Sequence, residues 1–430
     1  MNNKRKVSII TLGCKVNTYE SEAIANVLID KGFEVFSELE VADIYIINTC
    51  AVTNEGERKS RGYIAKCLKL NPNAEIYVCG CASQNNHEQF LKFDNVKYVC
   101  GTSNKLQLID AITGKIKNKT YDTSLETTYN DSYNTKHTRA RAVIKIQDGC
   151  NNFCTYCLIP YIRGRERSRS LSSIRFEIEK LEKTTKEIVL TGINMSAYGS
   201  DFKSKKLELI DVCELFLDFN VKFRISSLEV NVITQEFLNR LSKIQAFQPH
   251  FHLSMQSGCD NVLKKMNRHY TVQEYKDKVA LIRKYFPLAN ITTDVIVAFP
   301  TETEEDFETT YNTCKEIGFG WIHIFPYSKR DGTVASKWKN INDGNVAKER
   351  VKKLTMLAKH MRDEFTKKNI NQIYDVIIEQ KHDNYYIGHT PNFIKCYIKD
   401  EKQLQPNDVI SVQIKYAYND GAIAEIKESK

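Results

Sequence analysis

Residues 142–157 read AVIKIQDGCNNFCTYC and join a short apolar run to a loop with three cysteines. The run is rich in Val and Ile, which predicts a buried strand over residues 142–147. The loop carries Cys150, Cys154 and Cys157 in the spacing Cys-x-x-x-Cys-x-x-Cys. Because parallel α/β folds bind ligands at the carboxyl ends of their strands, this stretch predicts such a fold with a thiolate site.

Three thiolates in one tight loop are typical ligands of an iron–sulfur cluster. In a 4Fe–4S cluster they would leave the fourth iron without a protein ligand, and an open metal position can bind a substrate. A zinc loop is the alternative, but zinc favours a fourth Cys or His nearby, and the flanking sequence offers none. We therefore expect a 4Fe–4S cluster on Cys150, Cys154 and Cys157.

The alternation of strand and helix continues through the centre of the chain. Helical patterns such as SIRFEIEKLEKTT separate the strand candidates. Six β/α units predict a partial or full parallel barrel, here a partial (β/α)6 barrel, although an open sheet of the same order would show the same pattern. The six expected strands are residues 142–147, 187–191, 222–227, 250–255, 291–298 and 321–326.

The N-terminal region shows the same alternation of predicted strands and helices. The runs KVSIIT, DIYIINTC and EIYVCGC predict buried parallel strands, and ESEAIANVLIDKG predicts a helix that ends at Gly32. An open parallel sheet is expected here. Cys14, Cys50 and Cys81 each come at the end of one of these strands, so they can converge at one sheet edge. Three separate buried cysteines are the alternative.

The rest of the chain divides into a linker, a helix and a small β domain. We expect an N-terminal domain over residues 1–114, a polar linker over 115–139, a central domain over 140–369 and a C-terminal barrel of about five strands over 370–430. The central domain should end in a basic amphipathic helix over residues 346–369. Its apolar stripe is Val351, Leu354, Leu357, Met361 and Phe365.

Composition narrows the class of protein. The 430 residues are 42% hydrophobic and 27% charged, which is typical of a globular protein. No apolar run approaches the ~20 residues that cross a bilayer. Thirteen cysteines in a large chain without a convincing signal sequence favour metal binding over disulfides and indicate the cytoplasm. The net charge of +9 permits an RNA partner without requiring one.

With Tyr156 before its last cysteine, the loop resembles the radical S-adenosylmethionine (SAM) superfamily. The segments TLGCKVNTYESE, NTCAVTNEGERKSR and GCASQ also resemble the N-terminal domain of methylthiotransferases, and the terminal barrel resembles the TRAM type. The resemblance covers nearly the whole chain. It implies that the open iron binds SAM and that one electron splits SAM into methionine and a 5′-deoxyadenosyl radical.

The methylthiotransferase resemblance also implies a second 4Fe–4S cluster on Cys14, Cys50 and Cys81, whose open iron carries the transferred sulfur. Cys79 competes with Cys81 as the third ligand. Cys81 is preferred because the family pattern has Gly-Cys followed by Gln three residues later, as in Gly80, Cys81 and Gln84.

Strand-end motifs of the expected barrel are candidates for the SAM and substrate pocket. The resemblance implies pocket positions in TGIN, RISSLE, HLSMQSG and DVIVAFPTET, although Ala298 and Thr301 stand where glycines are usual. The basic run at residues 163–169 is expected either to contact RNA phosphate or SAM or to be a solvated loop. The cofactor-binding candidates are Tyr156, Gly192, Asn194, Ser226, Glu229, His252, Gln256 and Asp294.

Members of this family modify an adenosine beside the tRNA anticodon or an aspartate of a ribosomal protein. Lys15-Val16 resembles the branch acting on N6-threonylcarbamoyladenosine, because the isopentenyladenosine branch usually has Gln-Met there and the ribosomal-protein branch Pro-Lys. The expected partners are the tRNA anticodon loop, SAM, and an electron donor and sulfur source that the sequence does not identify. Those two other branches and a non-catalytic iron–sulfur RNA-binding module are the alternatives.

Overall fold

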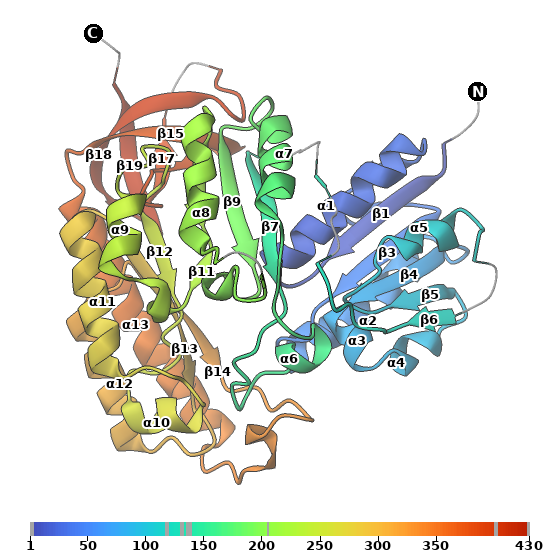
Figure 1. Ribbon diagram of the computed structural model, residues 1–430, viewed down its shortest axis with the longest axis horizontal. Coiled ribbons are helices and arrows are strands. Elements are labelled where there is room, and N and C mark those ends of the chain that lie inside the picture. Colours follow the sequence, from blue (N-terminus) through green and yellow to red (C-terminus); the bar gives the residue numbers. More distant parts are fainter. Residues whose placement is uncertain are drawn as a thin grey trace.

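The computed structural model describes residues 4–116, 120–129, 133–134, 140–203, 206–399 and 403–427. They form an N-terminal α/β sheet, a central β/α region and a small C-terminal barrel, which follow one another along the chain (Figure 1). In this part of the chain, none of the helices combines the length and the apolar character needed to cross a membrane.

The N-terminal sheet has six parallel strands in the order β2-β1-β3-β4-β5-β6. Helices α1 and α5 cover one face and α2 the other, which explains why its central strands are apolar throughout. The predicted open parallel sheet is confirmed. Its strands are β1 (Lys6–Thr11), β2 (Glu34–Phe36), β3 (Ile44–Thr49), β4 (Glu75–Gly80), β5 (Val96–Cys100) and β6 (Thr120–Asp122). Its helices are α1 (Lys15–Asp30), α2 (Asn54–Leu70), α3 (Cys81–Asn85), α4 (Glu88–Leu91) and α5 (Gln107–Ile112).

Strand β6 lies inside the segment that the sequence predicts to be a linker. It pairs with β5 through the register Tyr98↔Thr120, Val99↔Tyr121 and Cys100↔Asp122. An edge strand is held by backbone hydrogen bonds on one side and needs no apolar alternation. Residues 120–122 of the predicted linker therefore form an edge strand, and residues 117–119, 130–132 and 135–139 lie outside the described part.

The central region is a partial barrel built from two four-stranded sheets, ordered β10-β9-β7-β8 and β11-β12-β13-β14. Only Ser226 separates β10 from β11, and its backbone N–H donates to Leu190 O at 3.0 Å. Among the described residues β7 and β14 do not pair, so the wall is open between them. The strands are β7 (Arg141–Asp148), β8 (Arg167–Ser168), β9 (Glu187–Gly192), β10 (Lys222–Ile225), β11 (Ser227–Leu228), β12 (His250–Leu253), β13 (Asn290–Val297) and β14 (Trp321–Pro326).

Helices cover the outer face of this wall and build the largest hydrophobic core of the molecule. Capping boxes begin α11 at Thr271 and α12 at Thr303, as the Thr-x-x-Glu and Thr-x-x-Asp sequences favour. The helices are α6 (Ile159–Ile162), α7 (Leu171–Leu181), α8 (Leu209–Glu214), α9 (Gln235–Leu241), α10 (Asp260–Lys265), α11 (Val272–Tyr285) and α12 (Glu304–Ile317), with short 3-10 turns η1 (Met195–Ala197), η2 (Leu215–Asp218), η3 (Val230–Val232) and η4 (Ala335–Lys337).

Helix α13 (Gly344–Lys368) joins the central region to the C-terminal barrel. Its buried stripe includes Leu354, Leu357 and Met361, as predicted, and the helix packs against β14, β18 and β19. The five-stranded barrel is closed in the order β15-β16-β17-β19-β18, which confirms the predicted small barrel. Its strands are β15 (Ile373–His382), β16 (Tyr385–His389), β17 (Lys395–Ile398), β18 (Val409–Tyr418) and β19 (Gly421–Ile426).

The C-terminal barrel lies against the amino-terminal ends of the central strands. Arg224 of β10 donates hydrogen bonds to Pro391 O at 2.6 Å and Thr390 O at 3.1 Å. Arg141 at the start of β7 pairs with Glu379 of β15 at 2.8 Å. The cysteine loop and the N-terminal sheet lie at the opposite, carboxyl ends of the central strands, where a ligand is expected.

Candidate functional site

The cysteine loop follows β7 directly and lies at the carboxyl end of the partial barrel. Cys150, Cys154 and Cys157 are all partly accessible. The backbone N–H of Asn152 donates to Cys150 Sγ at 3.5 Å, and that of Ile159 donates to Cys157 Sγ at 3.4 Å. Such N–H···S hydrogen bonds stabilise thiolates, so the loop suits metal-bound sulfur.

Two residues that the sequence did not single out for the loop hold it in place. Arg268 directs Nη1 to Cys154 Sγ at 3.5 Å and pairs with Glu229 Oε1 at 2.9 Å. Glu229, a predicted pocket residue, also accepts from Asn152 Nδ2 at 2.7 Å. An Arg-Glu pair therefore ties the cysteine loop to the segment after β11.

Burial raises the pKa of Cys150 to about 11 and that of Cys157 to about 12. These thiols therefore remain protonated at neutral pH unless a metal replaces the proton. Their accessibility, sulfur chemistry and N–H donors fit three ligands of a 4Fe–4S cluster.

The second group of cysteines comes from three neighbouring strands. The register places Thr11 of β1 beside Asn48 of β3, and Thr49 of β3 beside Gly80 of β4. Cys14, Cys50 and Cys81 follow at the carboxyl edge, where adjacent strands lie ~4.8 Å apart. The structure therefore brings these three cysteines to one edge of the sheet, with Cys14 exposed and the other two buried.

Two glycines allow the chain to turn at this edge. Gly13 has a φ of +100°, and a Cβ there would lie 3.0 Å from Cys50 Sγ. Gly80 has a φ of +106°, and its Cβ would lie 2.5 Å from Thr49 O. Since L side chains disfavour both the conformation and the contacts, a glycine must precede Cys14 and Cys81.

Cys79 and Cys81 occupy different surroundings. Cys79 lies in the core under α1 and α5, where its thiol hydrogen-bonds with Cys100. Cys81 begins α3 and is hydrogen-bonded to Arg163, close to Cys14 and Cys50. This placement supports Cys81 as the third member of the group.

Neither group has the close spacing of a site for a single ion. Over the described ranges, no three His, Cys, Asp or Glu side chains are gathered tightly enough to hold one metal ion. In a 4Fe–4S cluster each thiolate binds a different iron, so its ligands are spread around the cluster. Cluster binding by either group therefore remains a prediction.

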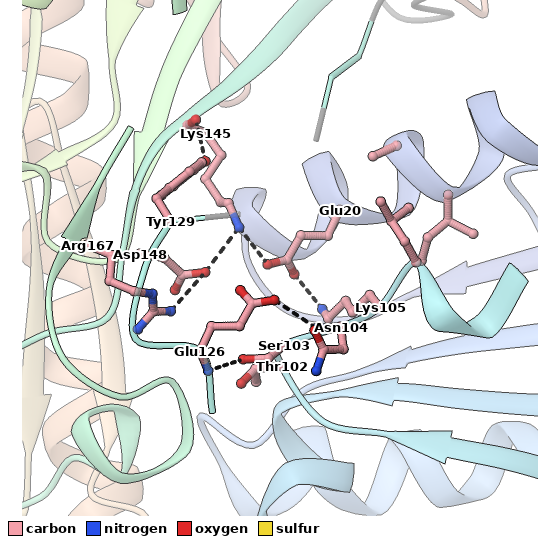
Figure 2. A pocket seen from close by; sticks show the side chains of 13 residues that line it. Glu20, Thr102, Ser103, Asn104, Lys105, Glu126, Tyr129, Lys145, Asp148 and Arg167 are labelled. Atoms are coloured by element: carbon pink, nitrogen blue, oxygen red, sulfur yellow. Dashed lines mark hydrogen bonds and ion pairs between the residues drawn. The ribbon is translucent and has the colours of Figure 1, made fainter. Parts of the chain in front are cut away.

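A buried ionic network joins the N-terminal sheet to the cysteine loop. Glu20 of α1 pairs with Lys105, with Lys145 of β7 at 3.1 Å and with Arg163 at 3.0 Å (Figure 2 shows the two lysine pairs). Asp148 at the end of β7 pairs with Lys145 and with Arg163, each at 3.1 Å. Although burial acts to raise it, the pKa of Glu20 is held well below its usual range by the three cations.

This network corrects the interpretation of the basic run at residues 163–169. Arg163 and Arg169 are fully buried, and Arg169 pairs with Glu177. These two arginines are therefore not on a solvated loop, whereas Arg165 is exposed beside the cysteine loop, 4.5 Å from the Phe153 ring, and for it the prediction stays open. The basic run alone could not show this, because the carboxylates that pair with it lie on α1, β7 and α7.

Arg163 also places positive charge beside the N-terminal cysteines. Four buried cations of the network, Lys105, Lys145, Arg163 and Arg167, face two carboxylates, Glu20 and Asp148. Burial raises the pKa of Cys81, and the nearby Arg163 and Lys105 act to lower it. A cationic environment of this kind favours thiolate sulfur and fits an anionic cluster.

The N-terminal sheet also contacts the other side of the barrel opening. The backbone N–H of Asn54 donates to Ser328 Oγ at 3.1 Å, and Arg330 pairs with Glu57 at 2.7 Å. With the ionic network on the β7 side, the sheet edge bridges the gap between β7 and β14. The N-terminal cysteines thus lie at the open side of the barrel.

The predicted pocket residues lie at or near strand ends around the barrel. His252 Nε2 is 3.2 Å from Asp294 Oδ2, and the backbone N–H of Gln256 donates to Asp294 O at 2.8 Å. The Asn194 backbone N–H donates to Gln147 Oε1 at 2.8 Å. The other three are placed as follows: Gly192 ends β9, the Ser226 hydroxyl lies 3.2 Å from Thr191 Oγ1, and the Tyr156 ring packs against Phe299.

Ala298 is strained where the sequence departs from the family pattern. It has a φ of +56°, a left-handed conformation that glycine adopts more readily. Its backbone N–H donates to Glu302 Oε2 at 2.6 Å, which fixes the turn after β13. The turn after β13 therefore forms although Ala298 stands where a glycine is usual.

Comparison with known proteins places these features in a family. Residues 6–101 match the Uncharacterized protein family UPF0004, and residues 144–314 match the Radical SAM superfamily. The threonylcarbamoyladenosine tRNA methylthiotransferase MtaB of Bacillus subtilis (strain 168) is 35% identical over 99% of this chain and 97% of that protein. This chain belongs to the MtaB methylthiotransferase family. The MtaB protein of Aquifex aeolicus (strain VF5) is 38% identical over 85% of this chain and 90% of its own length.

This MtaB-family chain is also similar to a protein of the neighbouring branch and to a solved structure. A tRNA-2-methylthio-N(6)-dimethylallyladenosine synthase of Natranaerobius thermophilus is 32% identical over 100% of this chain and 98% of its own. The radical SAM methyltransferase TsrM from Kitasatospora setae shares the fold with a TM-score of 0.55, at 13% identity over 78% of this chain and 77% of its own. Radical SAM membership implies SAM and a 4Fe–4S cluster.

Proposed function

We propose that this chain converts N6-threonylcarbamoyladenosine beside the tRNA anticodon to its 2-methylthio derivative. One observation carries the proposal: the sheet edge with Cys14, Cys50 and Cys81 bridges the open side of the barrel that carries the cysteine loop. Two sulfur-rich sites beside one barrel suit a reaction that must bring a sulfur donor to a carbon radical. The full-length similarity to MtaB proteins supports the substrate.

Each cysteine group would hold one 4Fe–4S cluster in this proposal. When bound, SAM and the cluster on Cys150, Cys154 and Cys157 would supply the radical that removes hydrogen from adenine C2. The site on Cys14, Cys50 and Cys81 would supply the sulfur, and a separate SAM would supply its methyl group. The chain's own part is positioning. The Arg268–Glu229 pair orients the loop, and Arg163 holds Cys81 within a cationic environment.

Residues at the strand ends would position SAM and the adenine. Asp294 and His252 form one polar pair on adjacent strands, and Ser226, Asn194 and Gln256 come from the wall around them. Hydroxyl, amide and carboxylate groups of this kind bind ribose hydroxyls and an amino acid moiety. Their role in SAM binding remains a prediction.

The basic face of α13 is suited to tRNA phosphates. Lys348, Lys352 and Lys359 recur at helical spacing opposite the buried stripe and are exposed. The C-terminal barrel adds a second surface for RNA next to this helix. A target base must leave its stack to reach a buried radical, which favours the anticodon loop over a paired stem. A tRNA substrate also agrees with a cytoplasmic protein.

Nucleoside mass spectrometry of tRNA tests the proposal. A deletion strain should lose 2-methylthio-N6-threonylcarbamoyladenosine, and the intact gene should restore it. The Cys50→Ala variant should not restore it, although the isolated variant still produces 5′-deoxyadenosine from SAM. Persistence of the methylthio nucleoside in the deletion strain, or loss of a methylthio mark from a ribosomal protein instead, would overturn the assignment.

A further inference from the structure

Strand β14 is the last strand of the central wall, and its inner face is open to solvent. Ile322 and Ile324 point outward, where they pack against the hydrophobic core beneath the helices. Because side chains alternate along a strand, His323 and Phe325 lie on the opposite, inner face of the wall. Both are exposed, Phe325 to 44%. Exposed side chains on an inner face indicate that the barrel is hollow at this point.

The neighbouring strands carry polar side chains on the same inner face. The register places Asp294 of β13 beside His323, and Ile296 beside Phe325. The His252 ring of β12 lies 5.7 Å from the His323 ring, and its Nε2 is 3.2 Å from Asp294 Oδ2. Phe325 belongs to none of the hydrophobic clusters of the described residues. Its ring is therefore not used by the packing of the protein itself.

Phe325 also lies between the two cysteine groups. On the barrel side, its neighbour Ile296 and Tyr156 of the cysteine loop pack against the same apolar cluster. On the other side, Ser328 comes three residues after Phe325 and accepts a hydrogen bond from the Asn54 backbone N–H at 3.1 Å. Asn54 begins α2, which follows the second of the N-terminal cysteines. A molecule that reaches both cysteine groups therefore passes the Phe325 ring.

The proposed substrate presents an aromatic ring whose edge must stay free. In adenine, C2 and the N6 substituent both lie at the edge of the ring. Chemistry at C2 therefore requires this edge to face the cysteine groups. An aromatic side chain that stacks on the face of the base holds it without covering the edge, and RNA bases that leave their own stack are commonly held in this way.

We infer that the target adenine stacks on the Phe325 ring; this inference rests on the proposed function. The stack replaces contacts that the base loses when it leaves the anticodon loop. The polar side chains of His252, Asp294 and His323 remain free of the base's face and are available to groups that form hydrogen bonds. SAM also contains an adenine, so a stack of Phe325 on SAM is the competing outcome of the test.

The experiment measures binding of two labelled anticodon stem-loop RNAs to the reconstituted enzyme by anaerobic fluorescence anisotropy. One RNA carries threonylcarbamoyladenosine at the target position, and the other carries an abasic site there, which offers no base to stack. The enzymes are the natural chain, Phe325→Leu and Phe325→Tyr, each with its iron content checked. Phe176→Leu is the matched control, because Phe176 is 43% exposed but lies on the outer helix α7.

Phe325→Leu should weaken binding of the threonylcarbamoyladenosine RNA about tenfold and leave the abasic RNA unchanged, since the stack exists only where a base is present. Phe325→Tyr should keep most of the affinity because its aromatic ring is retained. Phe176→Leu should change the binding of neither RNA. Equal weakening of both RNAs by Phe325→Leu, or no weakening of either, would overturn the inference.

Equilibrium dialysis with SAM identifies which adenine uses the ring. Phe325→Leu should bind SAM as tightly as the natural enzyme does, because the inference assigns the ring to the RNA base. Weaker binding of SAM by Phe325→Leu would assign the ring to SAM instead and would likewise overturn the inference.

Product analysis separates this inference from the proposed function. If the natural enzyme methylthiolates the threonylcarbamoyladenosine RNA but Phe325→Leu binds both RNAs normally, the role of Phe325 is wrong and the proposed function stands. If the natural enzyme makes no methylthio product from this RNA, the proposed function itself fails, and the inference fails with it.

Discussion

The two cysteine groups differ in how the chain assembles them. Cys150, Cys154 and Cys157 lie within one loop after β7, and backbone N–H groups of that loop donate to two of the sulfurs. Cys14 and its two partners come from the ends of three strands and depend on the register of β1, β3 and β4. One site is local, whereas the other exists only when a whole sheet has formed.

The sheet-edge site also depends on a second domain. Arg163, which lies beyond the cysteine loop, reaches back to Glu20 and Cys81, so the barrel helps to shape the N-terminal site. The loop site receives its Arg268–Glu229 pair from within the barrel domain. We therefore expect the loop site to tolerate damage to the N-terminal sheet, and the sheet-edge site to be sensitive to damage in either domain.

The largest effect is expected from Cys154→Ala. The variant should lose SAM cleavage by more than about a thousandfold, since groups that act as a unit fail together. Production of 5′-deoxyadenosine from SAM and dithionite measures this loss. The iron content should fall from about eight to about four per chain, because the sheet-edge site is independent. Loss of all iron would show that the two sites are not separate.

Cys81→Ala and Cys79→Ala form a matched pair for the sheet-edge site. Cys81→Ala should reduce methylthio product by at least about a hundredfold while SAM cleavage persists, because only the sulfur-donating site loses a ligand. Cys79→Ala should retain both activities and about eight iron atoms. Product analysis and iron content measure the pair, and the opposite pattern would assign Cys79 as the ligand.

Arg163→Leu tests whether the barrel supports the sheet-edge site. It breaks a buried ionic network and leaves Glu20 and Asp148 with fewer cations, which should cost about 3 kcal/mol of unfolding free energy. Urea unfolding measures the loss. Arg175→Leu removes an exposed ion pair with Asp218 and should cost less than about 1 kcal/mol. A loss of unfolding free energy as small as this for Arg163→Leu would show that the ionic network does not stabilise the protein.

Gly13→Ala probes the turn before Cys14. The positive φ and the contact with Cys50 Sγ should destabilise the protein by about 1–2 kcal/mol. Iron should be lost from the sheet-edge site first, leaving SAM cleavage intact. Unchanged stability and iron content would mean that this turn is not constrained.

The smallest effect is expected from the reverse change, Ala298→Gly, on the barrel side. Relief of the left-handed alanine should stabilise the protein by about 0.5 kcal/mol after the entropy of the unfolded glycine is subtracted. Thermal unfolding of the iron-free protein measures this gain. A loss of stability would show that the turn does not strain alanine.

The sequence predicts those features that depend on local pattern. The Cys150 loop, the six barrel strands and the apolar stripe of α13 are readable because spacing and periodicity encode them. The sequence does not predict the edge strand β6 or the burial of Arg163. Both depend on partners distant in the chain, namely β5 for the strand and Glu20 and Asp148 for the arginine.

The convergence of the N-terminal cysteines could be predicted only in part from the sequence. Strand-end positions make it possible, but only the parallel register of β1, β3 and β4 brings the three residues to one edge. The choice of Cys81 over Cys79 likewise becomes visible only when Cys79 is found beside Cys100.

Helix α13 packs against β14 of the central wall at one part of its length and against β18 and β19 of the terminal barrel at another. Together with the Arg224 bonds to Thr390 and Pro391, it joins the two barrels through direct contacts. If the terminal barrel binds RNA, as proposed, that RNA would be held at a fixed distance from the carboxyl ends of the central strands. That distance would then limit which nucleotide reaches the two cysteine groups.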